Sequence, residues 1–211
     1  MPVLESFEIE IPFKGARDYL QSADVYHAVL AHLDGQVGID SCHDVRLIFR
    51  NFARTRIAVI TEDELGDREA NASFLCEVGG EKLKRVLVET GKDVTAREPY
   101  PEEEIVERCV VDAEAKTVTL EHDDSLDRFK LMEILVAMNK AMHLEVFKEH
   151  PGKWLFTETR NPEPLFRQPW RRLSIRIKNQ LGVKLTRSVI EVGGVDAGYL
   201  CFSLQPPASS S

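Results

Sequence analysis

Apolar and polar residues alternate along residues 7–13, and this two-residue period indicates a strand with one buried face. A helix is expected next, over about 24–33, because Ser22 or Asp24 can cap its first turn and glycines follow it. Further runs of β-branched and apolar residues predict more strands before the middle of the chain, at 45–60, 72–78 and 83–89. The first half therefore predicts a strand, a helix and then several strands.

The same order of elements starts again after a charged segment, 93–104, which contains Pro99 and Pro101 and predicts a linker. Strand patterns there occupy 108–111, 116–120, 154–159, 173–177, 183–192 and 199–204. A long apolar helix is expected at 126–147. We therefore expect four parts: a first unit at 1–92, the linker at 93–104, a second unit at 105–204 and a disordered tail at 205–211.

Two short matches support an internal duplication. Glu77-Val78-Gly79-Gly80 recurs as Glu191-Val192-Gly193-Gly194, and each Gly-Gly pair lies between two strand-like runs, where a hairpin turn favours glycine. A second match, at 49–51 and 166–168, has nearly the same offset along the chain. Chance remains the alternative explanation, since four-residue matches occur in unrelated proteins.

The long helix indicates the fold class. Between Leu131 and Met142 the polar positions are Glu133, Asn139 and Lys140, so apolar residues occupy every side of the helix. Such a helix is buried, and it is too short to span a bilayer. The chain resembles the hot-dog fold in this order of elements. The resemblance implies an α+β double hot-dog, with two tandem units, each a curved antiparallel sheet wrapped around a helix.

A local motif resembles the hot-dog dehydratases that act on β-hydroxyacyl thioesters. In that family a catalytic His precedes the central helix, and a catalytic acid leads a run of small and Ala or Met residues within it. His122 lies just before the helix here, and residues 136–141 are similar to that run. The resemblance places the acid at Val136, which cannot serve as one, and Glu133, one turn earlier, is the candidate substitute.

Two acid–base pairs are candidate catalytic groups. His122 with Glu133 would supply the base and the acid that dehydration needs. Asp24 with His27 would supply the same groups from the first unit, because residues three apart share a helix face. The structural alternatives are a solvated His122 with Glu133 reaching solvent or an Arg, and a capping Asp24 with a boundary His27.

Arginines cluster at matching places in both units. Arg50 and Arg54 in the first unit, and Arg167 and Arg171 in the second, could hold the phosphates of coenzyme A or an acidic acyl carrier protein. Pairing with the many surface carboxylates is the alternative. No resident cofactor is expected, since coenzyme A or the carrier protein would arrive with the substrate.

The composition excludes several classes of function. A net charge of −8 disfavours nucleic-acid binding. The four cysteines form no Cys-x-x-Cys pair, which argues against a metal site and favours a reducing cytoplasm. No run of residues is long and apolar enough for a membrane span, and no nucleotide-binding or serine-hydrolase motif is present. Exposed sheet edges can pair with another copy of the chain, so a homo-oligomer stays an open alternative.

The sequence thus predicts an acyl-thioester-binding protein. Dehydration or hydration at the β-carbon is the leading reaction, and thioester hydrolysis comes next. A non-catalytic protein that binds a ligand or partner on a degenerate hot-dog fold is the alternative, because a fold does not by itself imply a reaction.

Overall fold

The structure is a computed structural model that describes residues 5–166 and 169–207, and it divides into two compact units. The first unit comprises Met1–Pro101 with Arg160–Phe166, and the second comprises Glu102–Thr159 with Arg167–Ser211. The segment Arg160–Phe166 therefore groups with the first half of the chain, although it follows the long helix at 131–146 in sequence.

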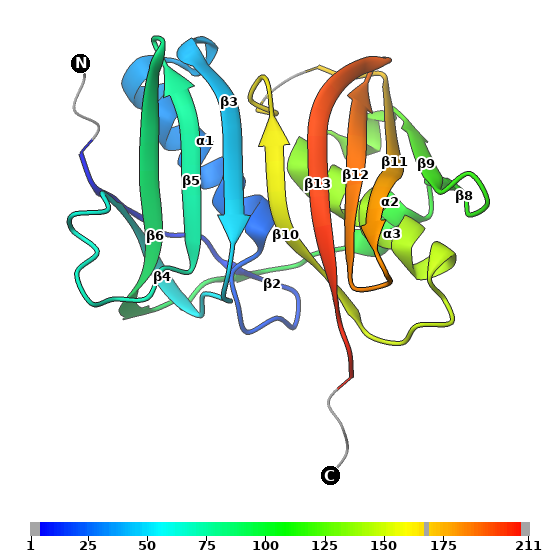
Figure 1. The fold of residues 1–211 in the computed structure, drawn as a ribbon, viewed down its shortest axis with the longest axis horizontal. Coiled ribbons are helices and arrows are strands. Elements are labelled where there is room, and N and C mark those ends of the chain that lie inside the picture. The colour runs from blue at the N-terminus through cyan, green and yellow to red at the C-terminus, as the bar shows by residue number, and fades with distance from the viewer. Residues whose placement is uncertain (1–4, 167–168, 208–211) are drawn as a thin grey trace. The chain divides into compact units, whose positions relative to one another are not determined.

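The first unit is built on one central helix and one antiparallel sheet (Figure 1). Its elements are β1 (Phe7–Ile9), β2 (Phe13–Lys14), α1 (Ser22–Val37), the 3₁₀ turn η1 (Ile39–Ser41), β3 (Cys42–Phe49), β4 (Thr55–Ile60), β5 (Ala72–Val78), β6 (Glu81–Asp93) and β7 (Arg97–Glu98). The strands of its sheet lie in the order β1-β4-β6-β5-β3.

The second unit repeats the plan of a strand, a buried helix and further strands. Its elements are α2 (Glu102–Val106), β8 (Val110–Asp112), β9 (Thr117–Glu121), the 3₁₀ turn η2 (Asp124–Leu126), α3 (Leu131–Val146), β10 (Lys153–Asn161), β11 (Arg172–Leu181), β12 (Leu185–Val192) and β13 (Val195–Gln205). Its strands lie in the order β8-β9-β11-β12-β13-β10.

The strong burial predicted for the long apolar helix, α3, is confirmed. On α3, residues 131–135, 137–139 and 141–143 are all buried. The helix packs against β8, β9 and β11. Near its end His143 also meets side chains from three further strands, at Trp154 on β10, Thr186 on β12 and Phe202 on β13. One helix that touches every strand of a sheet requires the sheet to curve around it.

The two units differ in how the last strands are ordered. In the second unit β11, β12 and β13 follow one another as antiparallel neighbours. In the first unit β6 pairs with both β4 and β5, so β4 and β5 are parallel to each other. Parallel strands need a crossover connection, and residues 61–71 supply it. The shared order of strand, helix and further strands supports the double hot-dog class, whereas duplication stays a prediction.

The crossover segment of the first unit covers the sheet face opposite α1. Ile60, Val86 and Val88 form a small apolar cluster with Ala70, and Leu65 packs against it. This second, smaller core exists because the chain returns across the sheet between β4 and β5.

The repeated Gly-Gly pairs form the turns that the sequence predicts. Gly79 and Gly80 connect β5 to β6, and Gly193 and Gly194 connect β12 to β13. Their φ angles are 58° and 82° in the first turn and 60° and 84° in the second. Two successive residues in this left-handed region define the tight hairpin turn in which glycine carries no steric penalty.

Several element boundaries differ from the sequence prediction. The strand expected at 7–13 is broken into β1 and β2, because Pro12 lacks the N–H that would continue the ladder. The segment expected as a linker, 93–104, holds β7, which pairs with β2, and the start of α2. The expected helix at 126–147 begins only at Leu131, because Asp123 caps the separate turn η2 instead.

Candidate functional site

Helix α1 carries two buried ionisable side chains close to its start. Asp24 is 1% exposed and His27 is 5% exposed. The cap residue of the helix is Gln21, so Asp24 lies inside the first turn and is not the cap that the sequence suggested. Asp24 and His27 are three positions apart, which places both on one side of the helix. The first unit therefore buries a carboxyl and an imidazole near the start of α1.

The surroundings of this pair are fixed by the segment that returns from the second half of the chain. The hydroxyl of Tyr26 donates to Asn161 Oδ1 at 3.1 Å and accepts from the Leu165 backbone N–H at 3.0 Å. Burial raises the pKa of Tyr26, so its proton stays in place. The ring of His27 contacts the rings of Tyr26 and Phe166, with centroids 5.6 and 6.1 Å away. Two aromatic rings thus lie beside the His27 imidazole.

An ion pair fastens the same segment to β3. Arg160 donates to both carboxylate oxygens of Asp44, at 2.6 and 2.8 Å, and holds the pKa of that carboxyl below its usual range. The Asp44 backbone N–H also donates to Pro162 O at 2.8 Å. These contacts place Asn161 and Leu165 where the Tyr26 hydroxyl can reach them.

In the second unit Glu133 has a structural role at the start of α3. One oxygen of its carboxylate, Oε2, accepts from the Lys130 backbone N–H at 2.9 Å. A glutamate at the third helical position commonly reaches back in this way. Glu133 is 3% exposed, so its carboxyl is as buried as the Asp24 carboxyl.

His122 lies at the surface, between β9 and η2. Its Nε2 contacts Asp127 Oδ1 at 2.9 Å, and its ring meets Trp170 edge-on with centroids 4.8 Å apart. A carboxylate oxygen only accepts, so Nε2 carries the hydrogen in this pair. The contacts of His122 described above are with Asp127 and Trp170, and the hydrogen bond of Glu133 is with the backbone at the start of α3.

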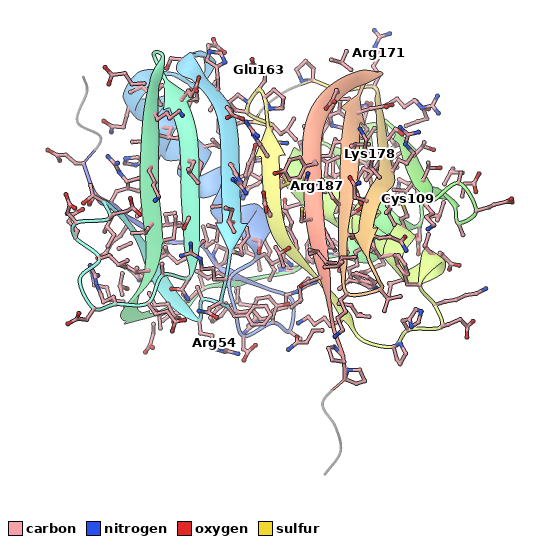
Figure 2. The ribbon with its side chains drawn as sticks, viewed as in Figure 1. Arg54, Cys109, Glu163, Arg171, Lys178 and Arg187 are labelled. Atoms are coloured by element: carbon pink, nitrogen blue, oxygen red, sulfur yellow. The ribbon has the colours of Figure 1, made fainter. Side chains whose placement is uncertain are left out.

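The arginines lie at strand ends and are exposed. Arg50 and Arg54 lie in the β3–β4 loop, and Arg171 directly precedes β11. Figure 2 shows Arg54 and Arg171 each at an end of the strands of its own unit. Arg54 makes a long contact with Asp18, at 3.5 Å. Arg167 lies outside the described residues.

Sequence reasoning missed two buried contacts that only the fold creates. Tyr26 and Asn161 are 135 residues apart, and no local pattern connects them. His143 on α3 meets Thr186 on β12, and both are fully or almost fully buried. The one available signal was Asn139, a polar residue in an apolar helix one turn before His143.

Among residues 5–166 and 169–207, no group of three or more metal-binding side chains is close enough to hold an ion. Within the same residues, no helix is long and apolar enough to cross a membrane.

Comparisons with known proteins find similarity in structure only. No family model matches the sequence, and no curated protein matches it either. The tesB protein of Mycobacterium avium subspecies paratuberculosis is 11% identical, with a TM-score of 0.49, over 96% of this chain and 93% of that one. The PpsC dehydratase domain of Mycobacterium tuberculosis, solved in complex with C12:1-CoA, is 8% identical, with a TM-score of 0.48, over 95% and 92%.

The dehydratase domain of a mycocerosic acid synthase-like PKS is 15% identical, with a TM-score of 0.47, over 92% of this chain and 84% of that one. The order of elements in each unit makes this chain an α+β protein of the double hot-dog class. Its chemistry has to be inferred from its own side chains.

Proposed function

We propose that this protein binds an acyl thioester, carried on coenzyme A or acyl carrier protein, and adds or removes water at the β-carbon of the acyl chain. The observation that carries the proposal is the burial of Asp24 and His27 on one side of α1, the central helix of a hot-dog unit. Burying an ionisable group costs free energy, so such groups are more frequent at functional sites than in ordinary protein cores.

The pair supplies both proton transfers of the reaction. In dehydration the imidazole of His27 takes the α-proton, and the carboxyl of Asp24 gives a proton to the departing β-hydroxyl. A double bond forms between the α- and β-carbons, and water leaves. Hydration is the reverse. The aromatic contacts of His27 with Tyr26 and Phe166 support this role, since they fix the orientation of the ring.

The first experiment measures hydration of crotonyl-coenzyme A and of longer enoyl thioesters by the loss of conjugated absorbance. We expect Asp24→Asn and His27→Gln each to lower kcat/KM by about 100-fold or more. His32→Gln is the matched control on the same helix, because His32 stacks on Phe7 with a centroid distance of 3.5 Å. Equal rates for wild type, Asp24→Asn and His27→Gln would remove the pair from the proposal.

The second-unit pair is tested in the same assay. His122→Ala and Glu133→Gln lose activity comparably if those residues take part in the chemistry. Retained activity in both variants limits the reaction to the first unit. Release of free coenzyme A from a saturated acyl thioester, which has no double bond to hydrate, would instead identify thioester hydrolysis as the reaction.

The carrier is tested through the arginines. We expect Arg54→Ala and Arg171→Ala to raise KM for coenzyme A thioesters while leaving KM for the short N-acetylcysteamine thioesters unchanged, because the latter lack the nucleotide phosphates. Equal effects on both substrates would exclude phosphate binding by these arginines.

A non-catalytic binding protein is the second candidate. It is favoured by the contacts of the other pair, because Glu133 caps the start of α3 and His122 pairs with Asp127 at the surface. Saturable binding of acyl-coenzyme A without turnover of any enoyl or acyl thioester would establish this candidate in place of the enzyme.

A further inference from the structure

The core of the second unit contains a polar cluster between α3 and β12. It consists of Asn139 and His143 on the helix and Thr186 and Ser188 on the strand, each no more than 1% exposed. Asn139 and His143 are four residues apart and share a face of α3, while Thr186 and Ser188 are two apart and share the inner face of β12. A cluster of this kind is unusual inside an otherwise apolar helix–sheet interface.

One half of the cluster is fully hydrogen-bonded. The backbone carbonyl oxygen of Asn139 lies 2.6 Å from His143 Nδ1, which must be the donor. A neutral imidazole then accepts at Nε2, so the Thr186 hydroxyl, 2.6 Å away, donates to it. Burial lowers the pKa of His143 to about 4, which keeps the ring neutral at pH 7.

The side chains of Asn139 and Ser188 form the other half, and no hydrogen bond satisfies them within the described part of the chain. Both side-chain atoms of the Asn139 amide and the Ser188 hydroxyl are buried and have no hydrogen-bond partner among the described residues. Buried polar groups are nearly always paired, because an unpaired one forfeits its hydrogen bonds to water. Three such atoms in one cluster therefore point to a group that the described part of the chain does not supply.

The residues that carry these unsatisfied atoms lie on two elements, α3 and β12, that touch at His143 and Thr186. Strands β9, β10 and β12 are parallel to one another, since each is related to the others through antiparallel neighbours. Helix α3 joins β9 to β10 and so runs back antiparallel to β12.

The His143–Thr186 contact fixes one rung between the two elements. Moving from His143 to Asn139 advances about 6 Å along the helix. Moving from Thr186 to Ser188 advances about 6.6 Å along the strand in the same direction. On this alignment Asn139 and Ser188 fall at the next matching positions of the helix and the strand.

We propose that Asn139 and Ser188, backed by His143 and Thr186, form a buried binding site for the hydroxyl or amide group of an uncharged, largely apolar small molecule. The amide of Asn139 and the hydroxyl of Ser188 each donate and accept, which suits a ligand group that does both. No member of the cluster is charged at pH 7, so an anion would gain no counter-charge there.

The neighbours of His143 favour an apolar ligand body. The rings of Phe147, Trp154 and Phe202 lie 5.6, 4.5 and 5.3 Å from the His143 ring, between centroids. An apolar wall with a few convergent polar groups is the usual composition of a small-molecule site. The site lies within the second unit and does not depend on the Asp24–His27 pair.

Trp154 provides a direct readout because it contacts His143. In a Trp170→Phe background, Trp154 is the one remaining tryptophan. We expect octanamide to change its fluorescence saturably and to raise the melting temperature. Octanoate, which has the same chain length and carries a charge at pH 7.5, is expected to bind at least tenfold more weakly.

Two variants and one control separate the site from general apolar binding. Asn139→Leu and Ser188→Ala should each weaken octanamide at least tenfold. Asn139→Leu should also raise the melting temperature of the ligand-free protein, because it removes a buried unsatisfied amide. The control Ser174→Ala, on the other face of the sheet at β11, should bind octanamide as wild type does.

Three results would overturn the proposal. The first is the absence of saturable octanamide binding by wild type. The second is equal affinity for octanamide and octanoate. The third is wild-type affinity in Asn139→Leu, or a lower melting temperature of its ligand-free form, which would show that the amide is already satisfied within the folded protein.

Discussion

Protonation of His143 should control the stability of the second unit in mild acid. The ring is fully buried, and burial lowers its pKa from 6.5 to about 4. The unfolded chain therefore binds a proton near pH 6.5, whereas the folded chain binds it only when the pH nears 4. Stability from this group is complete above pH 6.5 and is lost as the pH falls toward 4.

The size of the effect follows from the two pKa values. A pKa difference from 6.5 to about 4 corresponds to about 3 kcal/mol when both states are protonated, and to roughly 2 to 3 kcal/mol at pH 4.5. We expect wild type to lose this amount between pH 7.5 and pH 4.5, in addition to the contributions of its carboxyl groups.

The assay is urea denaturation at a series of pH values for wild type, His143→Gln and His150→Gln. His143→Gln removes the titrating ring, so its free energy of unfolding should fall less steeply between pH 7.5 and pH 4.5. His150 is exposed, so His150→Gln should keep the wild-type slope. If His143→Gln and wild type have the same pH dependence, the burial of a neutral imidazole at this position is refuted.

Further stability changes are expected at four positions. Gly35 lies inside α1 with open space around its missing side chain, so Gly35→Ala should raise the free energy of unfolding by about 1 kcal/mol in urea titrations. Gly194 has a φ of 84°, so Gly194→Ala should instead destabilise by about 1 to 2 kcal/mol, and an increase in stability would contradict the turn geometry. Tyr26→Phe removes a buried hydroxyl with two hydrogen bonds and should cost about 2 to 4 kcal/mol, measured by thermal unfolding. Ile60→Ala should cost about 2 to 5 kcal/mol, whereas Leu181→Ala, at 74% exposure, should change stability by less than about 0.5 kcal/mol; comparable losses would argue against the second core of the first unit.

The sequence was informative where a feature depends on neighbouring residues. The apolar run at 131–142 identified a helix buried on all sides, because its periodicity leaves no polar face. The Gly-Gly pairs identified two hairpin turns, because few other residues tolerate two successive positive φ angles.

Helix boundaries were predicted less well. The helix expected at 126–147 starts only at Leu131, five residues after η2 ends, and Asp123 caps η2. Capping residues are common in both kinds of turn, so a cap pattern identifies a helix start only when the chain direction after it is known. The same limit applies to Asp24, which lies inside the first turn of α1.

By itself, the sequence determined the two helix-centred units, the hairpin turns and the residue types available for catalysis. The tertiary structure decided which of those residues lie together. Asp24 and His27 were grouped by helix periodicity, but their burial depends on a sheet that closes over α1. The contacts of Tyr26 with Asn161 and of His143 with Thr186 join residues 135 and 43 positions apart, and the crossover at 61–71 exists because β6 lies between β4 and β5. Such contacts depend on strand order, and strand order results from the packing of the whole chain and leaves no local periodic pattern in the sequence.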